Sequence, residues 1–297
     1  MRTSRYEVFL KIVETQSLTK TAAYFGCTQS AVSQLVKALE SELGVSLLIR
    51  SKAGVRLTAE GEYLLPGMRQ IVSGERSVFE RSLELQNMNV GLIRIGIFTS
   101  LSCQWLPPYL KRFRQQFPNI GFELLQGDVT QISEWLRNGI VDIGFMTPPD
   151  SDEFYFHELL ADRMNIVLPP EHPLANGPVS LHDLREETFV LLESGYSLIT
   201  EKMFQEAAMR PKQQYTVKDD YTVMSMVESG LGVSLLPELM LQRSPYHLYA
   251  YPAEPAFYRH LGVSWLKKEQ NSMAVNKFVQ QLFREMGLES QIETETK

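Results

Sequence analysis

The sequence has little of what a disulfide-bonded, metal-binding or membrane-spanning protein requires. Its 297 residues include only two cysteines, Cys27 and Cys103, and their wide separation indicates neither a disulfide framework nor a metal-binding pair. No apolar run approaches the ~20 residues that a membrane-spanning helix needs. The first residues, MRTSRYEVF, lack the apolar core of a signal peptide. We therefore expect a cytoplasmic protein that does not associate with membranes.

The motifs that organise most catalytic sites are missing as well. The five histidines form no HExxH motif and are scattered along the chain at positions 157, 172, 182, 247 and 260. No GxSxG, P-loop or GxGxxG motif is present either. The sequence thus predicts no enzymatic activity, no metal site and no cofactor.

The charge that is present is unevenly distributed. The whole chain carries a formal net charge of −6, yet residues 1–60 contain eight Lys or Arg against five Glu, a net of +3, which leaves −9 for the remainder. An acidic protein with one basic end commonly uses that end to bind an anionic partner, such as a nucleic acid.

The basic end contains two short helical patterns separated by a turn. The second pattern begins after Thr28, a favourable N-cap residue, and Gly26 lets the chain turn sharply before it. A helical wheel gives this second helix an apolar face made of Ala31, Val32, Leu35, Leu39 and Leu43. The opposite face is polar and contains Gln29, Ser30, Ser33, Gln34, Lys37, Glu40 and Ser41. The residues expected to pack beneath it, from the first pattern and the turn, are Ala22, Ala23, Phe25 and Cys27. Two such helices predict a helix-turn-helix.

Two interpretations of the polar face remain open, because most amphipathic helices cover a core and their polar faces are only solvated. DNA binding is favoured by the short hydroxyl and amide side chains at the start of this face, where a recognition helix approaches base edges. The next segment, GVSLLIRSKAGVRLTAEG, predicts a β-hairpin wing that displays cations. Contacts to base edges are expected from Gln29, Ser30 and Ser33, and contacts to phosphates from Lys37, Arg50 and Arg56. The DNA-binding set also includes Gln34 and Lys52.

These motifs resemble the winged helix-turn-helix of the LysR-type transcriptional regulators. The resemblance rests on FLKIVETQSLTKTAAYFGCTQSAVSQLVKALESELGVSLLIR and GVRLTAEG. It continues through LPPYLKRFRQQFPNIGFELLQG, LRNGIVDIGFM, IVLPPEHPLA and VESGLGVSLLPE, and so covers about residues 4–286. Two positions depart from the family pattern: Leu48 stands where an aromatic residue is common, and Gln34 where a basic residue is common.

The resemblance implies an α/β protein with an N-terminal winged helix-turn-helix, a linker helix and an effector-binding domain similar to a periplasmic binding protein. The implied boundaries are 1–58, 59–88 and 89–297. The effector-binding domain would have a first subdomain at about 89–162 and 268–297 and a second at about 163–267, joined by strands that cross near 162–165 and 265–268. Such a regulator would bind promoter DNA sequence-specifically as a dimer of dimers, with RNA polymerase as a further candidate partner. It would respond to a small molecule in the cleft between the subdomains.

The linker helix carries a repeating apolar pattern. One row recurs every seven residues and consists of Leu64, Ile71, Val78 and Leu85; a parallel row consists of Leu65, Val72 and Phe79. The pattern fits packing on the helix's own domain or pairing with another subunit. We favour pairing, with dimerisation through Leu64, Ile71, Val78 and Phe79. Pro66 should weaken or bend the helix near its start.

After residue 89, short apolar segments alternate with helical ones. The expected strands contain GLIRIGIF, IGFELLQ, VDIGFM, MNIVLP, TFVLLE, GVSLLP and LGVSWL. Strands that alternate with helices predict mainly parallel sheets covered on both faces. In such sheets, ligands bind beyond the carboxyl ends of the strands, where helix N-termini offer free N–H groups.

Hydroxyl-bearing and small residues follow several of these strands. The candidate effector contacts are Thr99, Ser100, Ser102, Gly127, Thr130, Thr147, Gly195, Tyr196, Asp220 and Tyr221. Any one Ser or Thr is commonly a structural helix cap, but the clustering favours a site for a small molecule such as an organic acid. No Lys or Arg occurs within residues 98–110, so an anionic ligand would be met mainly by helix ends and hydroxyls.

Three other interpretations have less support in the sequence. An enzyme lacks its motifs, and an isolated solute-binding protein would leave residues 1–60 without a role. Redox sensing through Cys103, which falls at an expected helix N-terminus, would need a reactive thiol. No resolving cysteine lies nearby in the sequence, and a lone buried cysteine is the commoner case.

Overall fold

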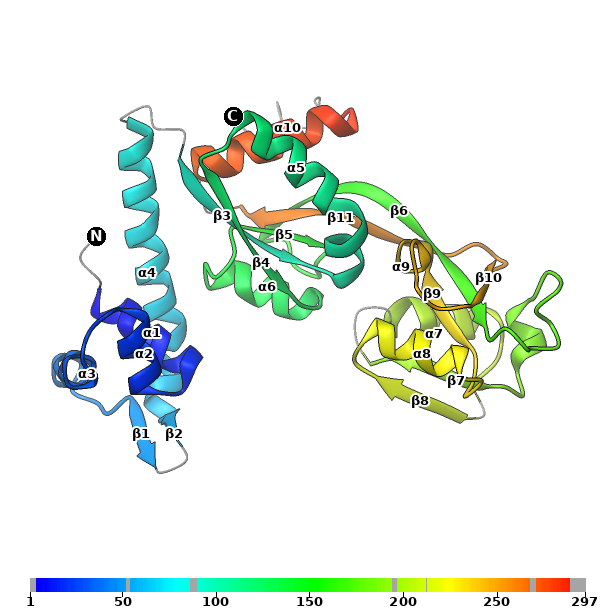
Figure 1. The fold of residues 1–297 in the computed structure, drawn as a ribbon, viewed down its shortest axis with the longest axis horizontal. Coiled ribbons are helices and arrows are strands. Elements are labelled where there is room, and N and C mark those ends of the chain that lie inside the picture. The colour runs from blue at the N-terminus through cyan, green and yellow to red at the C-terminus, as the bar shows by residue number, and fades with distance from the viewer. Residues whose placement is uncertain are drawn as a thin grey trace. The chain divides into compact units, whose positions relative to one another are not determined.

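The computed structural model of the protein describes residues 4–51, 54–85, 90–193, 197–211, 213–267 and 271–288. Contacts divide the chain into two compact units, drawn as ribbons in Figure 1. The first comprises Met1–Asn89 with Arg137–Ile140, and the second comprises Val90–Leu136 with Val141–Lys297. Among the described residues, no helix combines the length and the apolar character needed to cross a bilayer.

The N-terminal unit contains three short helices, a two-stranded hairpin and one long helix. These elements are α1 (Arg5–Thr15), α2 (Leu18–Tyr24), α3 (Gln29–Leu43), β1 (Leu48–Ser51), β2 (Gly54–Leu57) and α4 (Ala59–Leu85). Each short helix begins at a hydroxyl side chain that accepts a backbone N–H hydrogen bond from the first turn; these caps are Ser4, Ser17 and Thr28. The arrangement confirms the expected winged helix-turn-helix, in which β1 and β2 form the wing.

The buried face of α3 is narrower than the helical wheel predicts. Its buried residues are Val32, Val36 and Leu39, which pack with α1 and α2. Leu35 and Leu43 were expected in the core but are 38% and 36% exposed. Neighbouring helices cover one side of α3, so apolar residues at the flanks of its inward face stay in contact with solvent. The wheel gives the period correctly but overstates the width of the covered face.

Cys27 and Ala23 are exposed, although the sequence predicts both to pack inward. Cys27 follows Gly26, whose φ of 63° makes the left-handed turn between α2 and α3. The Cys27 N–H donates to the Ala22 carbonyl. The backbone of Cys27 therefore closes the turn while its thiol remains at the surface.

The long helix α4 has two different parts. Near its start, Leu64 and Leu65 pack against the same core as Met68, which is 3% exposed. Farther along, apolar side chains are exposed: the fractions are 43% for Ile71, 71% for Val78, 45% for Phe79 and 87% for Leu85. The helix continues through Pro66. Leu64 thus contributes to the fold of its own unit, while the later residues form an exposed apolar ridge.

The first half of the second unit is a sheet covered by helices on both faces. Its parallel strands are β3 (Gly91–Ile97), β4 (Ile120–Gln126) and β5 (Ile143–Met146). In Figure 1, α5 (Leu106–Gln116) and α10 (Met273–Met286) lie on one face and α6 (Val129–Arg137) on the other. A Cβ at Gly96 or Gly144 would press against Ile132 of α6. Glycine at these two strand positions therefore lets α6 approach the sheet closely.

Two long strands connect this half to the next. β6 (Phe154–Leu168) and β11 (Tyr258–Leu266) are antiparallel and pair from Arg163 with Tyr258 to Phe154 with Leu266. β6 then pairs with β9 (Ser234–Pro237) and β10 (Tyr249–Pro252), both antiparallel. The sheet is consequently mixed, and the expectation of mainly parallel sheets was wrong, because strands that pass between two subdomains run against each other.

The second crossing comes earlier than the sequence suggests. β11 already pairs with β5 at Gly262–Ser264, whereas the expected crossing lies near 265–268. β6 leaves β11 for β9 at Met164, which falls within the expected range of 162–165.

The second half of this unit is smaller and has its own core. It contains β7 (Thr188–Leu192), β8 (Gln213–Val217), α7 (Ser197–Glu206), α8 (Asp220–Glu228), α9 (Glu238–Leu241) and a 3-10 turn, η2 (Leu181–Leu184). β7 and β8 are parallel, and a bridge between Phe189 and Val233 connects β7 to the segment before β9. The two-subdomain α/β architecture is as expected. The sequence did not predict β8 or β10 as strands.

The burial of α3 can be tested by two identical substitutions. Leu39→Ala removes a fully buried side chain and should cost about 2–5 kcal/mol of unfolding free energy. For a unit of this size, that loss lowers the Tm by about 8 °C or more. Leu35→Ala, at a position that is 38% exposed, should cost less than about 1 kcal/mol. Calorimetry of the full chain measures both; equal shifts would contradict the described packing.

Candidate functional site

The N-terminal end of α3 presents small polar side chains to solvent. Gln29 and Ser30 are exposed, and the Ser30 hydroxyl lies 2.9 Å from the hydroxyl of the capping residue Thr28. One and two turns farther along the helix, Gln34 and Lys37 are exposed as well. Hydroxyl and amide groups at the start of an exposed helix can hydrogen-bond to base edges in a DNA major groove, which is wide enough to admit a helix.

The wing lies beside this helix end and supplies cations. The Arg50 guanidinium donates from Nη1 to the Ser33 hydroxyl at 3.0 Å. Ser33, expected to contact base edges, is therefore half-buried and hydrogen-bonded to Arg50, which was expected to contact a phosphate. Arg56 is exposed on β2. Lys52 lies outside the described residues.

The wing is anchored to the turn between α1 and α2. The Val55 N–H donates to the Gln16 carbonyl at 3.1 Å. Gly54 has a φ of +126°, and a Cβ there would lie 3.1 Å from the same carbonyl oxygen. Glycine is therefore needed both for the backbone conformation and for the close approach that holds the wing against the helices.

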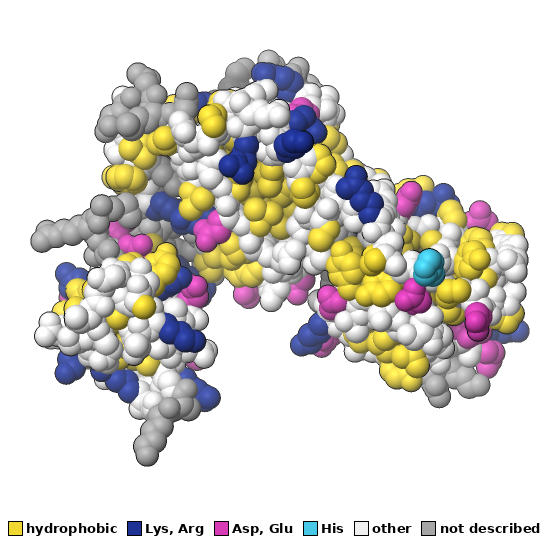
Figure 2. Space-filling view, in the orientation of Figure 1, with side chains coloured by type: hydrophobic (Ala, Val, Ile, Leu, Met, Phe, Trp, Pro, Cys, Tyr) yellow, Lys and Arg dark blue, Asp and Glu magenta, His cyan; other side chains and the backbone are white. Residues whose placement is uncertain are grey.

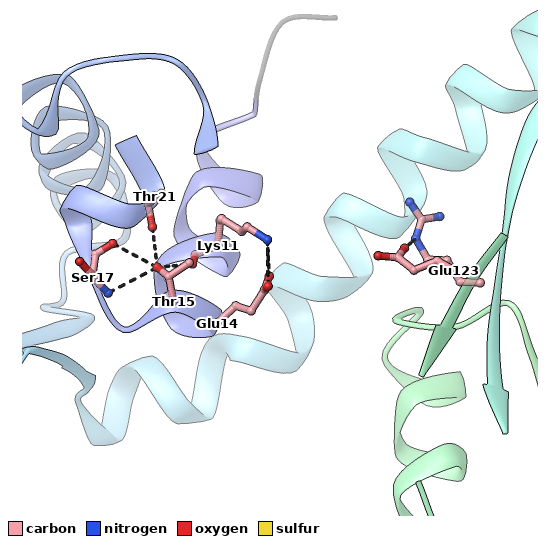
Figure 3. A network of polar contacts seen from close by, with 7 residues as sticks. Lys11, Glu14, Thr15, Ser17, Thr21 and Glu123 are labelled. Carbon is pink, nitrogen blue, oxygen red and sulfur yellow. Dashed lines mark hydrogen bonds and ion pairs between the residues drawn. The ribbon is translucent and has the colours of Figure 1, made fainter. Parts of the chain in front are cut away.

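Hydroxyl groups hold the start of α2 in place. Figure 3 shows Thr15 contacting Ser17 and Thr21, and the Thr15 and Thr21 hydroxyls lie 2.8 Å apart. Thr21 is completely buried. On the neighbouring surface, Lys11 forms an ion pair with Glu14 at 2.8 Å. The Thr15 contacts link the end of α1 to the start of α2, whereas the Lys11–Glu14 pair lies within α1.

A shallow groove of about 560 Å³ connects these features. Among the residues that line it are Ser17, Lys20, Gln29 and Arg50. Lys20 is exposed at the start of α2, and Figure 2 shows Lys and Arg side chains on the surface of this unit. Ser17 and Lys20 are not among the DNA-binding residues predicted from the sequence. The capping position of Ser17 before α2 is the sequence signal that could have identified Ser17.

The second candidate site lies at the carboxyl ends of β3, β4 and β5. The strand register brings Ile97 beside Gln126 and Phe145, so the residues after these strands are neighbours. The Gln126 amide donates from Nε2 to the Ser102 hydroxyl at 2.8 Å, and that hydroxyl donates to the Thr99 carbonyl. The structure thus places Ser102, one of the predicted effector residues, beside the end of β4, which Gly127 follows.

The residues after β4 have distinct roles. A Cβ at Gly127 would overlap the ring of Trp135, so glycine permits that ring to pack over the loop. Asp128 caps α6 by accepting the Gln131 N–H at 2.9 Å. Thr130 is exposed. Because Asp128 already caps α6, the Thr130 hydroxyl is not explained by helix capping. Thr147, after β5, is half-buried.

Ser100 occupies a different environment from the other hydroxyls. It is completely buried, and its hydroxyl accepts a hydrogen bond from Arg259 Nη2 at 2.7 Å. It makes no capping bond to the helical turn η1 (Leu101–Trp105) that follows. In this structure Ser100 therefore contacts Arg259 and is not exposed to a ligand. Sequence reasoning missed Arg259, which no local motif marks.

The second subdomain contributes α8 and α9 to the surroundings of η1. Asp219 caps α8 by accepting the Thr222 N–H at 2.8 Å. The pKa of the Tyr221 phenol is raised, first by burial and then by the neighbouring Cys103 thiol of η1. The Gln104 side chain donates to the Gln242 carbonyl at 2.6 Å. These contacts join residues that follow β3 to the second subdomain.

The remaining predicted residues are placed as follows. Asp220 is 7% exposed within α8, while Gly195 and Tyr196 lie outside the described residues. Cys103 is exposed and not buried. Within the described part of the chain, no cluster of three His, Cys, Asp or Glu residues could hold a metal ion.

Comparison with known proteins assigns both units. Residues 3–62 match the family described as "Bacterial regulatory helix-turn-helix protein, lysR family", and residues 86–287 match "LysR substrate binding domain". The uncharacterized HTH-type transcriptional regulator YvbU of Bacillus subtilis is 31% identical, over 97% of this chain and 100% of the relative. The probable HTH-type transcriptional regulator LrrA of Synechococcus elongatus is 33% identical, over 90% of this chain and 91% of the relative.

Solved structures share the fold. Full-length CbnR in complex with its target DNA has a TM-score of 0.72 at 20% identity, covering 94% of this chain and 98% of that chain. The effector-binding domain of QuiR in complex with shikimate has a TM-score of 0.61 at 21% identity, covering 67% of this chain and 98% of that chain.

The geometry of α3 and the wing predicts two different mutant phenotypes. Arg56→Ala should weaken binding to all DNA sequences and reduce the slope of log K against log salt by about one unit, because one phosphate contact is lost. Gln29→Ala should instead change sequence preference, by about 1–3 kcal/mol at one base pair. Titrations with specific and random duplexes at several salt concentrations measure both. Equal losses on both duplexes for both variants would contradict the assigned roles.

Proposed function

Because this chain belongs to the LysR family of helix-turn-helix transcriptional regulators, we propose that it binds promoter DNA through α3 and the wing and responds to a small molecule in its second unit. Family members are DNA-binding regulators with an effector-binding domain, and not enzymes. The observation that carries the proposal is the exposed hydroxyl and amide end of α3, beside Arg50 of the wing, which donates to Ser33. Such a regulator acts in the cytoplasm, with RNA polymerase as its further partner.

In the proposed complex, the start of α3 enters the major groove. Gln29 and Ser30 contact base edges. Ser33 faces the DNA major groove and accepts the hydrogen bond from Arg50. Lys37 and Arg56, both exposed, contact the phosphates on either side. Lys20 extends the phosphate contacts to the start of α2, because it lines the same groove on the protein surface as Gln29 and Arg50. Gln34 and Lys52 complete the set expected from the sequence.

The division of the chain at 1–58, 59–88 and 89–297 is supported by the position of α4, which lies between the wing and β3 in the sequence. We propose that the later part of α4 pairs with another copy of the chain. Its ridge of Ile71, Val78 and Phe79 is 43–71% exposed, and apolar side chains at heptad spacing are typical of helix pairing. Leu64 is left out of this interface because it packs inside its own unit. Two such dimers would form the dimer of dimers.

The proposed effector site is the space beyond β3, β4 and β5, facing α8. Ser102, Thr130, Thr147 and Tyr221 would supply hydroxyls, and Thr99 and Gly127 backbone groups. Gly195, Tyr196 and Asp220 belong to the same proposed set, on the side of the second subdomain. We leave Ser100 out of the proposed direct contacts, because it is buried and its hydroxyl accepts a hydrogen bond from Arg259. A polar organic acid fits a site rich in hydroxyls, and the related fold of QuiR binds shikimate.

A thermal-shift screen of the full chain against polar organic acids tests the effector site. A ligand at 100 times its Kd should stabilise the protein by roughly 2.7 kcal/mol. Thr130→Ala should then raise the Kd by about 2- to 13-fold, because one neutral hydrogen bond of about 0.5–1.5 kcal/mol is lost. A ligand that binds Thr130→Ala and wild type equally would place the site elsewhere.

The interface on α4 predicts loss of assembly in one charged variant. Val78→Asp, at a side chain that is 71% exposed, would put a charge into the apolar seam at a cost of several kcal/mol. Sedimentation should then show monomers, and binding to a two-half-site operator should fall because paired half-sites need a dimer. Leu231→Asp, at an exposed apolar position of the other unit, is the matched control. Wild-type sedimentation of Val78→Asp would refute the interface.

A further inference from the structure

A buried charge network lies where the two crossing strands separate. Arg259 of β11 and Asp162 of β6 are direct neighbours across the antiparallel pair, and each side chain is 3% exposed. Arg259 donates to Asp162 Oδ2 from Nε at 2.8 Å and from Nη2 at 2.6 Å. Planar guanidinium geometry makes such an arrangement both strong and directional.

The network extends into both subdomains. On one side, Arg259 Nη2 also donates to the Ser100 hydroxyl, which follows β3 of the first subdomain. On the other side, Asp162 Oδ1 accepts the backbone N–H of Leu239 at 2.9 Å, at the start of α9 in the second subdomain. A chain of hydrogen bonds therefore runs from Ser100 through Arg259 and Asp162 to Leu239.

The burial of this network restricts how it can change. Two charges removed from water are costly unless each remains paired, and loss of one partner leaves an uncompensated charge. We therefore expect the pair to stay together with the crossing strands when the network changes. Ser100 and Leu239 are its neutral ends, where a bond can lengthen or break without leaving a buried charge alone.

We propose that Arg259 and Asp162 are positioning residues of the effector response, which transmit movement of the segment after β3 to α9 through Ser100. This inference rests on the proposed function, because the same segment carries Thr99 and Ser102 of the effector site. Ser102 is held by Gln126 at the ligand edge, and Ser100, two residues before it, is held by Arg259 in the interior. A ligand that moves the Ser102 hydroxyl would also move Ser100, and with it the hydrogen bond from Arg259 to Ser100.

The inner position of Ser100 gives a test that needs no ligand. Amide hydrogen exchange of the full chain, followed by mass spectrometry, reports on the Leu239 N–H. Ser100→Ala removes the link on the first subdomain and should speed exchange at Leu239, in the second subdomain, by about tenfold or more, because a hydrogen bond to a charged group is worth at least one factor of ten. Ser133→Ala is the matched control: it removes another buried hydroxyl of the first subdomain, which contacts only the Met146 sulfur at 4.0 Å among the bonds described. It should leave Leu239 exchange unchanged.

A second variant tests whether Arg259 is the carrier. Arg259→Lys keeps a cation beside Asp162 but lacks the planar fork that holds Asp162 and Ser100 together. It should raise Leu239 exchange as Ser100→Ala does, and the double variant should be no faster than Arg259→Lys alone, because both remove the same link. Unchanged exchange in Ser100→Ala, an equal increase in Ser133→Ala, or additive increases in the double variant would each overturn the proposal. Because no effector is used, these outcomes are independent of whether the metabolite screen succeeds.

Discussion

The antiparallel pairing of β6 with β11 is the interaction on which the second unit depends. It carries the chain between the subdomains in both directions and continues the sheet of the first subdomain through β5. The register shifts between Leu261 and Gly262, and a Cβ at Gly262 would overlap the His157 carbonyl oxygen. Glycine at this irregularity lets β11 stay paired with β6 where it also begins to pair with β5. The same pairing sets Arg259 directly opposite Asp162.

Much of the architecture could be predicted from the sequence, because it depends on local patterns. Capping at Thr28 and the turn at Gly26 identify α3, and apolar runs identify most strands. The errors at Leu35 and Leu43, both on α3, have a common cause. Periodicity shows which face of a helix points inward, but the width of that face depends on which neighbours cover it. That information lies in the packing of α1 and α2 and not in α3 itself.

The charge network could not be predicted for a related reason. Ser100 and Arg259 are 159 positions apart, and neither belongs to a motif that would pair them. Sequence reasoning correctly placed Ser100 after β3, but a residue after a strand can face either the ligand edge or the interior. Ser100 faces the interior because its hydroxyl accepts a hydrogen bond from Arg259. The pairing of β6 with β11 sets the position of Arg259. Only the tertiary pairing reveals that Ser100 and Ser102 differ in role.

The pairing of Arg259 with Asp162 also bears on the chemistry of the proposed effector. A buried arginine near Ser100 would normally attract an anion, but both bonds to Asp162 neutralise it. No Lys or Arg occurs within residues 98–110, and Asp219 and Asp220 lie at the start of α8. On the proposed assignment, hydroxyls and helix ends, more than charged side chains, would therefore hold an organic acid. On the proposed assignment, discrimination between effectors comes from the directions of hydroxyl and backbone donors, since a misplaced polar group leaves an unpaired partner at a cost of about 1–3 kcal/mol. Such a site selects for the pattern of hydrogen-bonding groups on the ligand more than for its charge.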